Sequence, residues 1–94
     1  MSKRIAVRVR VTGRVQGIGY RYWVVEQAAQ LHLDGWVRNR RHGSVEAVFS
    51  GAGEAVAEMI GRCHRGPMLA RVDGVVEHAG PDSVETGFRA LPTA

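Results

Sequence analysis

An alternating segment that runs into a glycine-rich stretch constrains the fold of this chain more than any other feature. In residues 4–12, apolar side chains alternate with mostly basic ones, and one face is formed by Ile5, Val7, Val9 and Val11. This pattern predicts a half-buried strand. Three glycines follow within residues 13–19, and apolar side chains then recur with helical spacing around Tyr20, Val24, Ala28 and Leu31. A strand, a glycine loop and a helix are therefore predicted in this order.

The rest of the chain carries further strand and helix patterns. Residues 34–39 and 44–50 predict two antiparallel strands joined by a turn at 40–43. A second amphipathic helix is indicated by the spacing of Val56, Met59, Ile60 and Cys63, and it ends at Gly66-Pro67. Residues 70–78 predict another strand, and residues 86–91 a short closing strand.

The order β-α-β-β-α-β with a short last strand predicts an α+β fold, a ferredoxin-like α/β sandwich in which an antiparallel sheet carries two helices on one face. Ninety-four residues suit one compact domain, so we expect a single domain over residues 1–94 and no second one. We expect Trp23 and Trp36 to pack in the core, across the helix and the sheet.

Composition limits the compartment and the class of protein. No apolar stretch approaches the roughly 18 residues that a membrane span needs, and the N-terminus runs directly into the first strand pattern without the apolar region of a secretion signal. The single cysteine cannot form an internal disulfide. We therefore expect a cytoplasmic protein, with Cys63 as a buried packing residue on the inner face of the second helix rather than a nucleophile.

The charge is unevenly distributed along the chain. Residues 1–41 contain nine Lys or Arg and two acidic residues, whereas residues 42–94 contain four and seven. A basic half indicates an anionic partner, either a nucleic acid or a phosphorylated small molecule. The four histidines are ten or more residues apart, with no Cys or carboxylate at ligand spacing, so no metal and no cofactor are expected.

The glycine loop is suited to binding an anion. Glycines allow successive backbone N–H groups to turn inward around an oxyanion, and the following helix N-terminus adds free donors and the positive end of its dipole. Arg21 lies in the first helical turn, where a positive charge is disfavoured unless an anion is bound. Gly13, Gly17 and Gly19 have the wrong spacing for a dinucleotide fingerprint, and no Gly-Lys-Ser/Thr follows, so a nucleotide site is not predicted.

Two segments resemble the signatures of the acylphosphatase family. Residues 13–21, Gly-Arg-Val-Gln-Gly-Ile-Gly-Tyr-Arg, resemble its phosphate-binding loop, and residues 35–39, Gly-Trp-Val-Arg-Asn, followed by Gly43 and Gly51, resemble its second signature. The resemblance spans almost the whole chain and implies the same ferredoxin-like fold. His42 and Arg40 depart from the residues that are common in the family at these positions.

The resemblance implies hydrolysis of the carboxyl-phosphate bond of an acyl phosphate by direct attack of water. It assigns the catalytic roles to Arg21 and Asn39, with Asn39 positioning the water. It assigns phosphate binding to Arg21 together with the loop residues Val15, Gln16, Gly17, Ile18, Gly19 and Tyr20. Because a carboxylate with a pKa of about 4 leaves readily, neither a general acid nor a metal is required.

The expected partner is a small-molecule acyl phosphate, with no nucleic acid and no membrane, and the chain is expected to be a monomer. An RNA-binding module of the same element order remains an alternative, but Ser44 and Glu46 occupy outward positions of the third strand where stacking aromatics would be needed. A non-catalytic domain of the same fold is a further alternative. The presence of both Arg21 and Asn39 argues against it.

Overall fold

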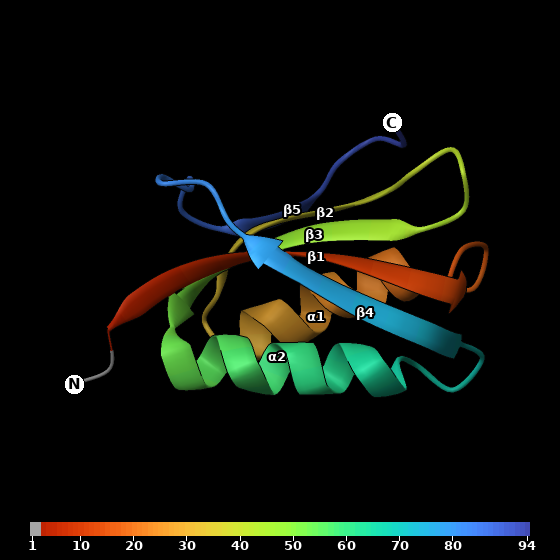
Figure 1. The fold of residues 1–94 in the computed structure, drawn as a ribbon, viewed down its shortest axis with the longest axis horizontal. Coiled ribbons are helices and arrows are strands. Elements are labelled where there is room, and N and C mark those ends of the chain that lie inside the picture. The colour runs from red at the N-terminus through yellow and green to blue at the C-terminus, as the bar shows by residue number, and fades with distance from the viewer. Residues whose placement is uncertain (1–2) are drawn as a thin grey trace.

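The computed structural model describes residues 3–94 as one layer of sheet and one layer of helices (Figure 1). The elements follow in the order β1 (Arg4–Arg14), α1 (Tyr20–Gln30), β2 (Asp34–Asn39), β3 (Val45–Ala52), α2 (Gly53–Arg65), β4 (Arg71–Ala79) and β5 (Phe88–Ala90). Both helices lie on the same face of the sheet, and the other face is free of helices. This arrangement confirms the predicted ferredoxin-like α+β fold.

The five strands form one sheet in the order β4-β1-β3-β2-β5. The first four pair antiparallel, as predicted, but β5 runs parallel to β2 and the sheet is therefore mixed. The expectation of a purely antiparallel sheet is wrong at this edge. β4 and β2 run in opposite directions. Because the chain reverses its direction once between β4 and β5, β5 runs in the same direction as β2.

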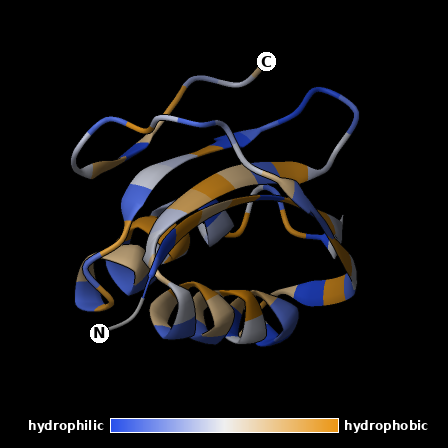
Figure 2. Ribbon diagram, turned by 60° about the vertical axis from the view of Figure 1, so that its left-hand side comes forward, coloured by the Kyte–Doolittle hydropathy of each residue, from blue (hydrophilic) through white to orange (hydrophobic). Residues whose placement is uncertain are grey.

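The core lies between the sheet and the two helices. Tyr20, Val24 and Ala28 are the buried residues of α1, and α2 buries the predicted set of Val56, Met59, Ile60 and Cys63. Figure 2 shows hydrophobic segments along the central strands and hydrophilic residues in the turn between β2 and β3. The two helices of residues 3–94 are too short and too polar to cross a membrane.

The two tryptophans occupy different environments. Trp23 is half-buried against the core, with its ring centroid 5.4 Å from that of Tyr20. Trp36 lies instead on the open face of the sheet, where the Arg38 guanidinium lies 4.9 Å from its ring centroid. The expected core position of Trp36 is wrong because Val37, which is completely buried, takes the inward position of β2 and alternation turns Trp36 outward.

Candidate active site

The loop between β1 and α1 ends in a left-handed glycine. Gly19 has a φ of 80° and caps the N-terminus of α1, and Gly17 has a φ of 75°. A side chain at Gly19 would meet no atom within 4 Å, so the requirement for glycine comes from the backbone conformation rather than from space. Gly19 provides no side-chain cap and the first turn holds no acidic residue, so the free N–H groups there can serve an external anion.

Arg21 extends from the first turn of α1 towards the end of β5. Its Nη1 donates a hydrogen bond to the backbone oxygen of Leu91 at 3.1 Å, and its guanidinium lies 5.4 Å from the ring centroid of Tyr22. Its Nε is buried and has no hydrogen-bond partner within residues 3–94. The side chain is therefore anchored at one nitrogen and retains donors that are not used inside the protein.

Asn39 is the last residue of β2 and pairs with the fully buried Val45 of β3. Because side chains of paired residues point to the same face of a sheet, the Asn39 side chain projects towards the helix layer. Its Oδ1 is buried, and no donor in the described part of the chain reaches it. An amide oxygen buried in this way is available to a water molecule or a ligand.

Arg21 and Asn39 meet in one hollow of about 220 Å³, lined by Val15, Gln16, Gly17, Gly19, Tyr20, Arg21, Tyr22 and Asn39. The structure thus brings together all the site residues predicted from the sequence except Ile18, whose side chain packs against the core. Tyr22 also lines the hollow and is not among the predicted residues. Its position directly after Arg21 is the one signal that the sequence offers for it.

Gln16 ties the loop to the turn between β2 and β3. Its Nε2 donates two hydrogen bonds, both of 2.7 Å, to the backbone oxygens of Arg40 and Ser44. Arg40 begins the turn directly after Asn39 and Ser44 follows it, so the two hydrogen bonds hold the loop and the end of β2 in a fixed relation. No side-chain pattern predicts such a contact, because both acceptors are backbone carbonyls far away in sequence.

Four of the nine basic residues among the first 41 form ion pairs within the protein. Arg8, Arg38 and Arg40 all form ion pairs with Glu46, and Arg4 pairs with Asp34. No acidic partner of Arg21 occurs among residues 3–94. Within the basic half, Arg21 beside the glycine loop is therefore a better anion-binding candidate than Arg8, Arg38 and Arg40, which pair with Glu46 on the open sheet face.

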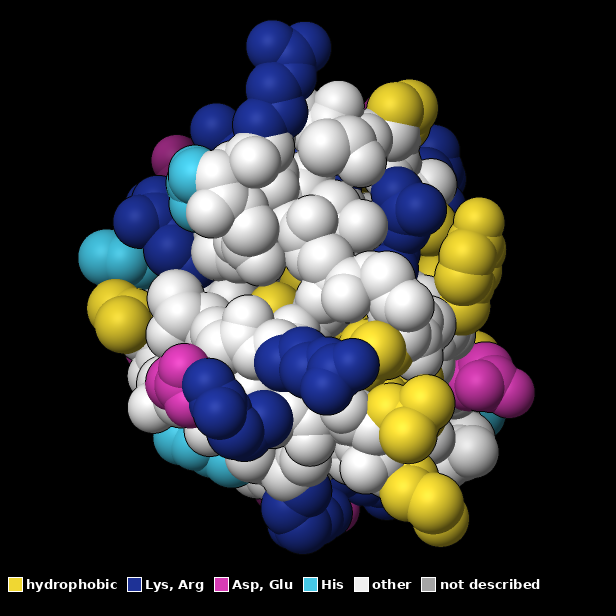
Figure 3. Space-filling view, turned by 90° about the vertical axis from the view of Figure 1, so that its right-hand side faces the viewer, with side chains coloured by type: hydrophobic (Ala, Val, Ile, Leu, Met, Phe, Trp, Pro, Cys, Tyr) yellow, Lys and Arg dark blue, Asp and Glu magenta, His cyan; other side chains and the backbone are white. Residues whose placement is uncertain are grey.

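The end of the molecule that carries this hollow is shown in Figure 3. Lys and Arg side chains are spread over the face, and acidic side chains lie towards its edges. Within the described chain, no three His, Cys, Asp or Glu residues cluster in a way that could hold a metal ion.

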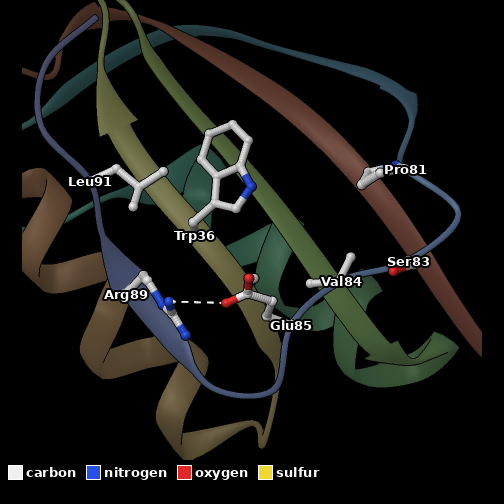
Figure 4. Close-up of a pocket in the computed structure, with 8 residues that line it drawn as sticks. Trp36, Pro81, Ser83, Val84, Glu85, Arg89 and Leu91 are labelled. Atoms are coloured by element: carbon white, nitrogen blue, oxygen red, sulfur yellow. Dashed lines mark hydrogen bonds and ion pairs between the residues drawn. The ribbon is translucent and has the colours of Figure 1, made fainter.

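A second hollow, of about 280 Å³, lies on the open face of the sheet (Figure 4). Trp36, Pro81, Val84 and Leu91 form much of its wall. The two charged residues that line it, Arg89 and Glu85, pair with each other at 3.2 Å. This hollow is larger than the one at the glycine loop, but its two charged side chains neutralise each other. The smaller hollow contains the unpaired charge of Arg21 and is therefore the better candidate for chemistry on an anion.

Comparison with known proteins shows which family this chain belongs to. Residues 7–90 match the model of the family Acylphosphatase. An acylphosphatase of Rhizorhabdus wittichii is 54% identical over 90 residues, covering 96% of this chain and 91% of the relative. An acylphosphatase of Rhodopseudomonas palustris is 60% identical over 95 residues, covering 95% and 96%. The structure of an acylphosphatase from Coxiella burnetii superposes with a TM-score of 0.90 at 32% identity, covering 94% of this chain and 93% of that one.

Proposed function

The chain belongs to the acylphosphatase family, whose members hydrolyse acyl phosphates to a carboxylate and inorganic phosphate, and we propose how its own residues carry out this reaction. The loop of residues 15–20 and Arg21 hold the phosphoryl group. Asn39 positions the attacking water. The observation that carries this assignment is that Arg21 Nε and Asn39 Oδ1 are both buried and unpartnered in residues that line one hollow.

Phosphate binding draws on two kinds of donor. The backbone N–H groups of the loop and of the first turn of α1 surround the phosphate oxygens, and the positive end of the helix dipole favours their charge. Arg21 adds charge-assisted hydrogen bonds, each of which can contribute about 1.5 to 3 kcal/mol. The hydrogen bond to Leu91 holds the guanidinium in place before the substrate binds, so the side chain loses little further conformational freedom on binding.

Asn39 acts on the nucleophile. Its Oδ1 accepts a hydrogen bond from the water, and its Nδ2 is free to donate to the phosphoryl group without placing another charge beside an anion. The water oxygen forms a bond to phosphorus while the bond between phosphorus and the acyl oxygen breaks, and the electron pair leaves with the carboxylate. A phosphate oxygen takes the water's proton, because no carboxylate or imidazole lines the hollow.

The reaction needs no metal in this scheme. The carboxylate leaving group has a conjugate acid with a pKa of about 4, so its departure requires neither a Lewis acid nor a general acid. The catalytic work that remains is neutralisation of charge and placement of water, which the side chains and backbone of the hollow supply. We further infer a cytoplasmic monomer; the single cysteine is buried, which leaves no exposed thiol for a disulfide bond.

Hydrolysis of benzoyl phosphate tests the residue roles. The purified protein should release phosphate at the same rate with and without EDTA. Arg21→Ala should weaken both turnover and inhibition by phosphate. Asn39→Ala should lower kcat by roughly 100-fold or more and leave phosphate inhibition nearly unchanged. A folded Asn39→Ala variant with nearly full activity would remove Asn39 from the mechanism, and activity that depends on added Mg²⁺ would contradict the metal-free scheme.

A further inference from the structure

We propose that Glu46, on the face of the sheet opposite the active site, is a positioning residue that fixes the end of β2 and with it the side chain of Asn39. The inference rests on the role of Asn39 proposed above. It assigns to a buried carboxylate, which contacts neither the phosphate loop nor the hollow, a function in turnover rather than in substrate binding.

Glu46 is the meeting point of three guanidinium groups. Its Oε1 accepts from Arg38 Nε and Arg40 Nη1, both at 2.9 Å, and its Oε2 accepts from Arg8 Nη1 at 3.2 Å. Its side chain is only 8% exposed. Burial opposes ionisation, but the hydrogen bonds from Arg38, Arg40 and Arg8 outweigh this effect and hold the pKa of Glu46 below its ordinary value.

Two of these arginines are the immediate neighbours of Asn39 in the chain. Arg38 is paired directly with Glu46 across β2 and β3, whereas Asn39 is paired with Val45. Alternation therefore sends Arg38 to the open face and Asn39 to the helix face of the same strand. The Glu46 carboxylate thus binds the side chains of Arg38 and Arg40, the two neighbours of Asn39, on the open face of the sheet. The Asn39 amide is left free on the other face, where the substrate binds.

Loss of the Glu46 charge would displace the arginine side chains at the end of β2. Arg38 and Arg40 would face each other and Arg8 without a counter-ion, and like charges at close range repel. Arg40 also lies in the turn that Gln16 holds through the Arg40 backbone oxygen. Displacement of Arg38 and Arg40 would therefore shift the peptide groups around Asn39. A misplacement of about 1 Å at a catalytic group can lower a rate by up to about 100-fold.

Glu46→Gln is the variant that tests this role, because it keeps the size of the side chain and removes its charge. Glu85→Gln is the matched control, since it removes the acid of an exposed ion pair with Arg89 and Glu85 does not line the hollow that contains Asn39. With benzoyl phosphate, Glu46→Gln should lower kcat by roughly 10-fold, while KM and the phosphate inhibition constant stay within about twofold of the wild type. The control should remain within about twofold in all three quantities.

Calorimetry of phosphate binding distinguishes a misfolded Glu46→Gln protein from a folded one with a lower kcat. The stoichiometry of phosphate binding, measured by calorimetry, should stay close to one per chain if the variant is folded, so that a lower kcat cannot come from a smaller active fraction. A parallel loss of phosphate affinity would mean general disruption of the site and would overturn the positioning role. So would a kcat equal to that of Glu85→Gln.

The double variant Asn39→Ala/Glu46→Gln shows whether Glu46 acts through Asn39. If it does, Glu46→Gln should lower kcat by less than twofold in the Asn39→Ala background, because the group that it positions is already absent. A full 10-fold loss in that background would overturn the inference. An inactive Asn39→Ala with a fully active Glu46→Gln would overturn the role of Glu46 alone, whereas a fully active Asn39→Ala would overturn the role of Asn39 and, with it, that of Glu46.

Discussion

Arg21 Nε and Asn39 Oδ1 are both buried without a hydrogen-bond partner in the described structure, and the two residues line the same hollow. One is a donor that carries positive charge and the other is a neutral acceptor. Buried polar atoms are nearly always paired, so two unpaired atoms of complementary kind in one place are unusual for a purely structural region. An anion together with a water molecule would satisfy both.

Phosphate should stabilise the wild type but not Arg21→Ala. A ligand that binds the native state raises the unfolding free energy with its occupancy, and at a concentration 100 times its Kd the gain is about 2.7 kcal/mol. Thermal denaturation with and without phosphate measures this effect. Arg10→Ala, which removes an equally charged side chain from the exposed open face, is the control and should keep the full stabilisation. Equal melting-temperature increases in Arg21→Ala and the wild type would place the phosphate site elsewhere.

Gln16→Ala should loosen the phosphate loop from the β2-β3 turn. The Arg40 and Ser44 carbonyls still accept from the backbone N–H groups of Gly43 and Arg40, so the variant loses two ordinary hydrogen bonds, at a cost of about 1 to 3 kcal/mol in unfolding free energy. We expect KM for benzoyl phosphate to rise several-fold, and Gln16→Glu to be worse because a carboxylate would face two carbonyl oxygens. Steady-state kinetics and urea denaturation test this, with Gln30→Ala on the outer part of α1 as control. Unchanged KM in both Gln16 variants would contradict a holding role.

The stabilisation that Glu46 contributes should disappear in acid. Its pKa is lower in the folded protein than in the unfolded chain, where a Glu titrates near 4.3. The charged form therefore stabilises the fold above the unfolded pKa, and this contribution is lost as the pH falls through the folded pKa. Urea denaturation of the wild type and Glu46→Gln from pH 7 to pH 3 should show the difference in unfolding free energy shrinking below about pH 4. A difference that stays constant over this range would contradict the expectation.

The Cys63 thiol should be unreactive in the native protein. Burial raises its pKa to about 12, so almost no thiolate is present at pH 8. Because the unfolded thiol ionises at a lower pH, this group favours the folded state at neutral pH, and its contribution falls as the pH rises from about 9 towards 12. A colorimetric disulfide reagent at pH 8 should label the protein in urea but not under native conditions. Rapid native labelling would show that α2 opens locally.

The loop and the helices were predictable because their signals are local. Glycine at positions 17 and 19 reflects a backbone requirement of those residues themselves, and the spacing of Tyr20, Val24 and Ala28 alone defines the buried face of α1. The roles of Arg21 and Asn39 came from the family resemblance. Their meeting in one hollow is a result of the fold.

The errors and omissions have a common origin. The expectation for Trp36 rested on the preference of a large aromatic side chain for the core, and alternation along β3 made Glu46 an ordinary outward residue. Whether an outward residue is exposed depends on which strands lie beside it. Glu46 is buried because β3 lies between β1 and β2, whose arginines close over it from both sides. The hydrogen bonds that Gln16 and Arg21 donate to backbone oxygens cannot be predicted from the pattern of side chains in the sequence.

The sequence by itself determined the order of the elements, the faces of the helices and the glycine loop, because each depends on the spacing of residues within about one element. The tertiary structure decided the parallel direction of β5, the pairing of the basic residues and the joining of loop, turn and Asn39. Several of these features depend on contacts between residues that are 24 to 70 positions apart, as from Gln16 to Arg40 and from Arg21 to Leu91. No pattern within one element predicts these contacts, because they exist only after the sheet has formed.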